Sequence, residues 1–377
     1  TALAAPHPIA LPFREALYFD PSLPTAYGYR VELERGQQLL VRTAMPDDHA
    51  RVFVDLFTAP RDSAEAPRPV RSADSTGALT YAIRRSGAYL LRLQPELLHE
   101  GRVTLTVQTD ASLAFPVAGV DSRAIRSRFG APRDGGRRRH HGVDIFAPRG
   151  TPAVAATDAV VSGLRNGGLG GKSVWLRDAD GHNLYYAHLD SQLVRRGQRV
   201  SVGDTVGLVG NTGNARTTPP HLHFGIYRDG PTDPYPFIHR PTERPAALRV
   251  DSARFGQWAR AARTPARVRT APSPRSDVLA ALPRQTAVYV AGGHGAFYRV
   301  TLPDGRSGYL AAALLEPADA PIAPLAIRDG RPVRRHPAAT APAIDSLAAG
   351  ATAAVLARYE AFVLIDRPGQ QPGWIQE

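Results

Sequence analysis

Four histidines and one aspartate are spaced so that they could bind a metal ion and act on a substrate beside it. His140 stands four positions before Asp144, and His221 and His223 are separated by one residue. Because extended chain repeats every two residues, each pair can project its side chains from one face of a strand. Two imidazoles and one carboxylate would leave the fourth position of a tetrahedral zinc ion open for water, as a catalytic zinc site requires. His188 ends a nearby strand-like run. Each group alone is more often an ordinary strand feature, but together in one glycine-rich segment they predict a metal site.

Strands are expected to position these residues. Residues 173–176 and 183–188 are rich in apolar and aromatic side chains, and a turn sequence at 178–181 separates them. This pattern predicts a hairpin whose second strand ends at His188. We therefore expect residues 112–248 to form one antiparallel β domain that contains all the clustered histidines.

The N-terminal residues 1–111 also alternate in the manner of strands, but they contain no cluster of ionisable residues. Short period-2 runs, separated by turns with Pro and Gly, predict an antiparallel β-sandwich that serves as an accessory domain. The runs are 29–33, 52–56, 79–83, 89–93 and 103–107.

The C-terminal part contains an internal repeat with an offset of 65 residues. A constant register over several matches indicates a duplication, and each copy has the size of a small five-strand barrel. We expect the two barrels at 266–317 and 322–377. The matches relate Val268-Arg269 to Val333-Arg334, Leu282 to Leu347, Val290 to Val355, Phe297 to Phe362 and Gly308-Tyr309 to Gly373-Trp374.

The segment that connects the central domain to the repeat, residues 249–265, is expected to be a linker. Phe255, Trp258 and Ala262 are spaced at three and four positions within it. This spacing predicts a short helix with those side chains on one face.

Composition limits the classes of function. The chain has 377 residues, with 43% hydrophobic and 21% charged residues, which is typical of globular protein. It has no cysteine, so disulfide frameworks, thiolate metal sites and a cysteine nucleophile are excluded. No apolar run reaches the roughly 18 residues of a membrane-spanning helix. The net charge of +12 predicts affinity for polyanions such as nucleic acid, anionic lipid or acidic wall polymer.

Five short motifs follow one another in the central segment. They are His140-x-Gly142-x-Asp144, Ala147-Pro148-x-Gly150-Thr151-Pro152, Tyr186-Ala187-His188, Gly210-x-Thr212-Gly213 and His221-Leu222-His223-Phe224. In this order they resemble the lysostaphin-type (β-lytic) zinc endopeptidases, which cut peptidoglycan. The resemblance covers about residues 113–235 and implies a duplicated-hybrid-motif antiparallel β fold. The repeated C-terminal domains resemble bacterial SH3-like domains, which often bind cell walls; a structural spacer is the alternative.

The resemblance also assigns roles to the clustered residues. It implies that His140, Asp144 and His223 bind one zinc ion per chain, and that His188 and His221 form the catalytic pair beside the metal. His141 falls on a variable position and should not bind the metal. Gly225 departs from the family, whose members often have Glu there, but the position is not a ligand.

Together these features predict a zinc-dependent endopeptidase that hydrolyses cross-links or stem peptides of peptidoglycan. The D-alanyl to diaminopimelyl cross-link is favoured over glycyl bridges. Four arginines precede the site and could attract carboxylates of peptide stems or form a solvated basic loop: Arg133, Arg137, Arg138 and Arg139. The chain begins with Thr and has no charged-then-apolar leader, so we expect a mature exported protein of the periplasm, the extracellular space or the cell envelope.

Three other functions fit parts of the sequence. A catalytically silent relative could bind peptidoglycan or activate another wall hydrolase, but such relatives typically lack a ligand. A sugar phosphotransferase carrier shares the fold and has two close histidines, but it needs neither Asp144 nor a third histidine. Specific nucleic-acid binding would need aromatic residues among the basic ones. Peptidoglycan is thus the expected substrate and anchoring polymer, and the sequence does not indicate an oligomeric state.

Overall fold

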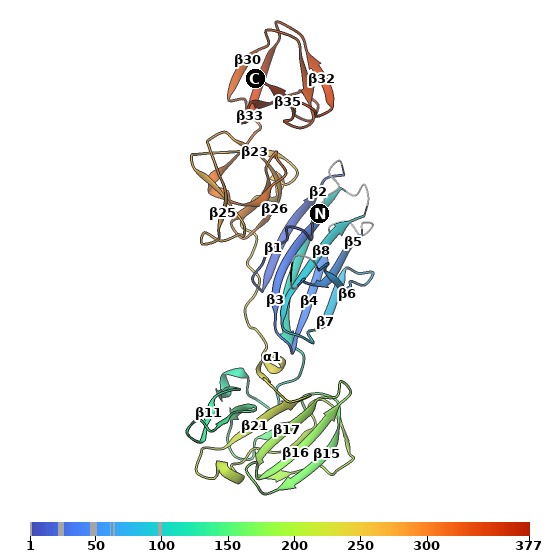
Figure 1. The fold of residues 1–377 in the computed structure, drawn as a ribbon, viewed down its shortest axis with the longest axis vertical. Coiled ribbons are helices and arrows are strands. Elements are labelled where there is room, and N and C mark those ends of the chain that lie inside the picture. The colour runs from blue at the N-terminus through green and yellow to red at the C-terminus, as the bar shows by residue number, and fades with distance from the viewer. Residues whose placement is uncertain (1, 22–25, 46–50, 61, 63–64, 97–99) are drawn as a thin grey trace.

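The computed structural model describes residues 2–21, 26–45, 51–60, 62, 65–96 and 100–377. The fold is mainly β, as predicted, with a central domain at one end, an N-terminal sandwich in the middle and two small β domains beyond it (Figure 1). None of the helices in the described ranges is long and apolar enough to cross a membrane.

The N-terminal domain is a sandwich of two sheets, with strand orders β1-β3-β8-β5-β6 and β2-β9-β4-β7. Alternate side chains, among them Leu17, Tyr29 and Leu91, are buried between the sheets. The five predicted runs fall on β3, β5, β7, β8 and β9. The strands are β1 His7–Pro8, β2 Phe13–Phe19, β3 Tyr27–Leu33, β4 Gln37–Ala44, β5 Val52–Thr58, β6 Arg68–Ser72, β7 Ala78–Ala82, β8 Gly87–Pro95 and β9 Gly101–Ala111.

The central domain is built on an antiparallel sheet of order β10-β13-β21-β17-β16-β15-β19, with β22 paired to β21. A small sheet β14-β20-β18 and a hairpin β11-β12 complete it, and α1, Tyr235–Ile238, follows. The predicted hairpin is β16 and β17. The strands are β10 Ile125–Ser127, β11 Pro132–Arg133, β12 Arg138–Arg139, β13 Val143–Phe146, β14 Pro152–Val154, β15 Ala159–Asn166, β16 Lys172–Asp178, β17 Asn183–Leu189, β18 Ser191–Gln192, β19 Arg199–Val200, β20 Thr205–Leu208, β21 His221–Tyr227 and β22 Pro231–Thr232.

The two C-terminal domains, hereafter the first and second copies, have the same strand order. In the first copy the order is β25-β24-β28-β27-β26-β23, and in the second it is β32-β31-β35-β34-β33-β30. Corresponding strands start 65 or 66 residues apart, so the predicted repeat is also a structural one. The strands are β23 Trp258–Ala261, β24 Ala266–Arg269, β25 Val278–Leu282, β26 Ala287–His294, β27 Phe297–Thr301, β28 Ser307–Ala311, β29 Leu315–Pro317, β30 Ala323–Ala326, β31 Arg331–Arg334, β32 Ala343–Leu347, β33 Thr352–Tyr359, β34 Phe362–Ile365 and β35 Gly373–Gln376.

The short helix predicted in residues 249–265 is wrong. The segment instead contains a 3-10 turn, Ser252–Arg254, and strand β23. The helical spacing of Phe255 and Trp258 is overridden because β23 pairs with both β26 and β29. β23 is the first strand of the repeat, as β30 is in the second copy, so tertiary pairing decides its conformation. The other 3-10 turns are Ser122–Ala124, Asp134–Gly136, Gly213–Ala215 and Ala312–Leu314.

The sandwich connects the other domains. Strand β2 pairs with β26 of the first copy, so one sheet runs through both domains. At its other end, Phe237 of α1 packs against the backbone of Gly36. The central domain and the second copy therefore lie at opposite ends of the molecule (Figure 1).

Candidate metal centre

Strand pairing brings the predicted site residues together. Asp144 on β13 lies directly opposite His223 on β21, and Ala187 of β17 lies on the other side of His223. Directly opposed residues of neighbouring strands have Cβ atoms about 5 Å apart, so this register puts the carboxylate beside the imidazole. His140 approaches from the turn before β13, and His188 follows Ala187 near the end of β17.

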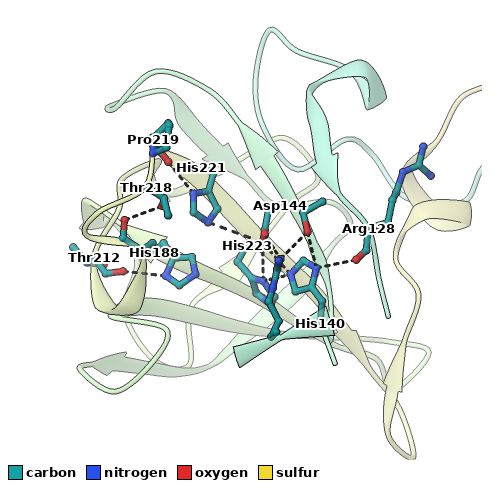
Figure 2. Close-up of polar contacts among 12 residues, drawn as sticks. Arg128, His140, Asp144, His188, Thr212, Thr218, Pro219, His221 and His223 are labelled. Carbon is teal, nitrogen blue, oxygen red and sulfur yellow. Dashed lines mark hydrogen bonds and ion pairs between the residues drawn. The ribbon is translucent and has the colours of Figure 1, made fainter. Parts of the chain in front are cut away.

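Three donor atoms form a compact triangle (Figure 2). Asp144 Oδ1 is 3.0 Å from His140 Nε2 and 3.0 Å from His223 Nδ1, and these two nitrogens are 2.9 Å apart. His140 and Asp144 are buried, and His223 is half-buried. Gly142, in the first motif, allows the His223 ring to lie this close to the backbone, because a Cβ on Gly142 would be 2.8 Å from that ring.

The donor set fits zinc. The carbonyl of Arg128 can only accept a hydrogen bond, so His140 Nδ1, 3.0 Å away, carries the proton, and the lone pair of Nε2 faces the triangle. An anionic oxygen and two imidazole nitrogens this close need a proton or a cation between them. Two nitrogens and one carboxylate oxygen are the ligand types of three-ligand zinc sites.

The surroundings favour the metal-binding protonation states. Burial alone would raise the pKa of Asp144, but the close contacts of its carboxylate with the imidazoles of His140 and His223 outweigh it and hold that pKa well below its usual range. Burial lowers the pKa of His223. An ionised carboxylate and a neutral imidazole are the forms that bind metal ions.

His188 and His221 lie beside the triangle. His188 Nδ1 donates to the carbonyl of Thr212 at 3.0 Å, and His221 Nδ1 donates to the carbonyl of Pro219 at 2.9 Å, so both Nε2 atoms keep a lone pair. The two rings meet edge to face, with centroids 5.0 Å apart, and His221 Nε2 is 4.0 Å from Asp144 Oδ1. Burial, followed by the nearby His223 and His221, lowers the pKa of His188 to about 4.

The backbone of His188 is held in an unusual conformation. Its φ is +62°, in the left-handed region that side-chain-bearing residues rarely adopt. The His188 amide donates to the carbonyl of Gly170 at 2.8 Å, while its ring is bound to Thr212. Residues in such conformations often occur at functional sites.

All five predicted site residues thus converge, and their described hydrogen bonds and ion pairs stay within the central domain. His141 lies outside the cluster, exposed, with its ring stacked near Phe129. Two contacts of the site were not predicted from the sequence. The carbonyl of Thr212 binds His188, a role that the Gly210-x-Thr212-Gly213 motif could have suggested, and Arg133 contacts Asp144.

Comparison with known proteins agrees with this geometry. Residues 138–234 match peptidase family M23, and residues 264–316 match the bacterial SH3 domain. An L-Ala–D-Glu endopeptidase of Bacillus subtilis is 38% identical over 138 residues, which are 33% of this chain and 42% of that protein. The peptidoglycan DD-endopeptidase ShyC of Vibrio cholerae is 37% identical over 31% of this chain and 28% of its own length. The glycyl-glycine endopeptidase ALE-1 of Staphylococcus capitis is 39% identical over 26% and 29%.

The chain spans less than half the length of each of these relatives, and the similarity falls on the domain that holds the cluster. The bacterial SH3 match falls on the first copy of the repeat. The chain therefore contains a peptidase domain of family M23, the lysostaphin-type family, together with a bacterial SH3 domain.

Proposed function

We propose that the protein is a zinc-dependent endopeptidase that hydrolyses peptide bonds of bacterial peptidoglycan. The observation that carries the proposal is the complete triangle of His140, Asp144 and His223, with two further imidazoles beside it. The matched relatives support it, since their names describe endopeptidases and one names peptidoglycan.

Each site residue has a part in this proposal. His140, Asp144 and His223 would hold one zinc ion per chain, which when bound supplies a Lewis acid and lowers the pKa of water. The rings of His188 and His221 meet edge to face beside the triangle, and each is tied in place through its Nδ1 atom. We assign to this pair the removal of a proton from the attacking water, its delivery to the leaving amine and the stabilisation of the oxyanion.

The bond that is cut is a separate question within the same proposal. The names of the three relatives specify L-alanyl–D-glutamyl, DD- and glycyl-glycine bonds. The arginine-rich composition leads us to favour cleavage at D-alanyl cross-links. Mass spectrometry of fragments released from muropeptides of defined cross-link chemistry identifies the bond directly.

We further propose that the protein acts in the cell envelope, in the periplasm or outside the cell, with peptidoglycan also as its anchor. The match to the bacterial SH3 domain and the basic charge support wall binding. Since the first copy shares a sheet with the sandwich, truncation after Pro317 removes the second copy without opening that sheet. If the second copy binds the wall, this truncation should weaken sedimentation with insoluble peptidoglycan while turnover of small soluble muropeptides is kept.

Removal of the metal tests the proposed activity. We expect one zinc per chain by elemental analysis, complete loss of muropeptide cleavage after chelation and recovery when zinc is added. Cleavage that persists in chain shown to be free of metal would refute the zinc mechanism.

Two variants on one strand separate the assigned roles. His223→Ala should lose zinc as well as activity, because it removes one of three protein ligands. His221→Ala should keep zinc and lose about 10²–10⁴-fold in kcat, since it removes only a proton-transfer or oxyanion group. Zinc content of the two purified proteins decides the assignment. A zinc-free His221→Ala beside a loaded His223→Ala would reverse the roles of these histidines.

A further inference from the structure

The two oxygens of Asp144 have different partners. Oδ1 is 3.0 Å from both His140 Nε2 and His223 Nδ1. Oδ2 accepts a hydrogen bond from Arg133 Nη2 at 2.6 Å and forms an ion pair with it. The carboxylate therefore presents one oxygen to the candidate metal position and the other to a guanidinium.

The guanidinium is itself held in place. Arg133 Nη2 also donates to Ser127 Oγ at 2.6 Å, and Ser127 on β10 lies opposite Asp144 on β13. Ser127 Oγ is 3.3 Å from His140 Nδ1. Arg133 thus connects the strand that carries Asp144 with a residue that touches the back of His140.

The main chain supports the same arrangement. Arg133 belongs to β11, which pairs with β12 directly before His140. The His140 amide donates to the carbonyl of Ala131 at 2.9 Å, and the amide of Gly130 donates to the carbonyl of His140 at 2.8 Å. The hairpin that places Arg133 therefore also places a candidate ligand.

We propose that Arg133 is a positioning residue of the zinc site, which holds Oδ2 of Asp144 so that Oδ1 alone faces the metal. The proposal rests on the proposed function, since it concerns the same metal. A carboxylate with both oxygens free can rotate and can bind zinc through one oxygen or both. A charge-assisted hydrogen bond of this length removes that freedom.

A positive charge near a zinc site also repels the ion, so repulsion by Arg133 opposes the gain in zinc affinity from orienting Asp144. Partners that orient metal ligands typically contribute about 10–100-fold in metal affinity, which indicates that orientation usually prevails. Here the guanidinium contacts the oxygen that points away from the donor triangle, and it binds Ser127 with the same nitrogen. We therefore expect loss of Arg133 to weaken zinc binding.

The test compares the full chain with Arg133→Gln, Arg133→Lys and a control, Arg138→Gln. Arg138 is on the same hairpin but pairs with Asp134, at the surface. Zinc affinity is measured by competition with a chromophoric chelator, without substrate. We expect about 10–100-fold weaker binding for Arg133→Gln, partial recovery for Arg133→Lys, which keeps the charge but on a donor of different length and shape, and no change for Arg138→Gln.

Substitution with Co²⁺ gives a second readout. Release of Oδ2 should allow Asp144 to bind through both oxygens, and the added coordination should lower the visible absorbance relative to wild type. Should Arg133→Gln fail to fold, Ser127→Ala is the second variant. It keeps the contact of Arg133 with Asp144 but removes the contacts of Ser127 Oγ with Arg133 and with His140 Nδ1, and it should weaken zinc binding in the same direction, by less.

The outcomes separate this proposal from the proposed function. Wild-type affinity and spectrum in Arg133→Gln, beside a wild-type chain that binds zinc, would refute the role of Arg133 and leave the peptidase intact. A wild-type chain that binds neither zinc nor Co²⁺ would refute both.

Discussion

The two C-terminal copies use the same surface to dock onto the domain before them, but with opposite chemistry. In the first copy, Arg299 on β27 faces the sandwich, where it contacts Glu15 at 3.1 Å. The repeat offset puts Leu364 at the same position of the second copy, where it packs in an apolar cluster with Trp374. That cluster includes Ala287 of the first copy, and the rings of Trp374 and Trp258 meet edge to face.

The polar contact between Glu15 of the sandwich and Arg299 of the first copy is completely buried. Glu15 is 0% and Arg299 2% exposed. Glu15 also accepts a hydrogen bond from Tyr29 at 2.5 Å, and Arg299 donates to Tyr309 at 3.2 Å. A buried ion pair is a poor source of net stability but is costly to break, so it enforces one docking geometry. The apolar contact around Leu364 of the second copy gains its stability from the burial of apolar surface and needs no ion pair.

Placing at either position the residue that the other copy has there should destabilise the protein, and the larger effect is expected for Leu364 in the second copy. Leu364→Arg puts a charge at a position that is 0% exposed, without the equivalent of Glu15. The desolvation cost of an unpaired buried ion is several kcal/mol, so we expect the second copy to unfold. Limited proteolysis with mass spectrometry should show new cleavage after residue 317 and continued protection before it. Resistance throughout would mean that the second copy tolerates the charge.

The reverse change should affect the joint between the sandwich and the first copy. Arg299→Leu leaves Glu15 buried without its cation, which typically costs about 3–5 kcal/mol. The double variant Glu15→Leu with Arg299→Leu should recover most of this loss, because the contact is then apolar, like the one around Leu364 in the second copy. Hydrogen exchange of the β2 and β26 amides reports the joint locally. Equal protection in all three proteins would show that the ion pair does not hold the domains together.

Sequence alone predicted the parts of the molecule that depend on local pattern. The alternation of apolar residues around Tyr29 and Leu91 predicted strands, and the 65-residue offset predicted two similar domains. The spacing of His221 and His223 predicted that both lie on one face of a strand. The convergence of the site also followed from short motifs, because Asp144 of HxGxD and both histidines of HLH lie on strands that turned out to be neighbours, β13 and β21.

Contacts between distant segments could not be predicted in the same way. Nothing local in β2 shows that it pairs with β26, more than 270 residues later, and the helical spacing around Trp258 pointed to the wrong element. Arg133 was recognised only as one of four nearby arginines, since no spacing rule links it to Asp144. One signal was present: Gly292-Gly293 stands where the second copy has Ala357-Arg358.

This difference in glycine content allows a second test of the contact between β2 and β26, with a smaller expected effect on stability. Leu17 on β2 pairs with Gly292, and a Cβ there would lie 2.3 Å from the carbonyl oxygen of Ala16. Gly292→Ala should therefore push β2 away, at a cost of about 1–3 kcal/mol, as for other overpacked sites. Gly330→Ala in the second copy is the control, since a Cβ there would lie 3.6 Å from its nearest neighbour, the carbonyl oxygen of Leu347. Thermal unfolding of both variants should separate them, and equal stability would mean that β2 and β26 adapt without cost.

His7, which contacts Tyr309 at the edge of the contact between the sandwich and the first copy, should make this contact sensitive to pH. Its ring meets Tyr309 edge to face, with Nδ1 3.3 Å from the carbonyl of Thr270. Burial, and then the charge of Arg299, lower the pKa of His7 to about 3. The folded chain therefore stays unprotonated at this residue while the unfolded chain takes up a proton below about pH 6.5. Stability should thus be lost as the pH falls from about 6.5 towards 3, and His7→Gln should lack this contribution. Melting temperatures of the two proteins at pH 7.5 and pH 4.5 give the comparison: wild type should lose more than His7→Gln. A difference between them that stays constant with pH would mean that His7 is protonated equally in the folded and unfolded chains, and that the joint does not exclude the charge.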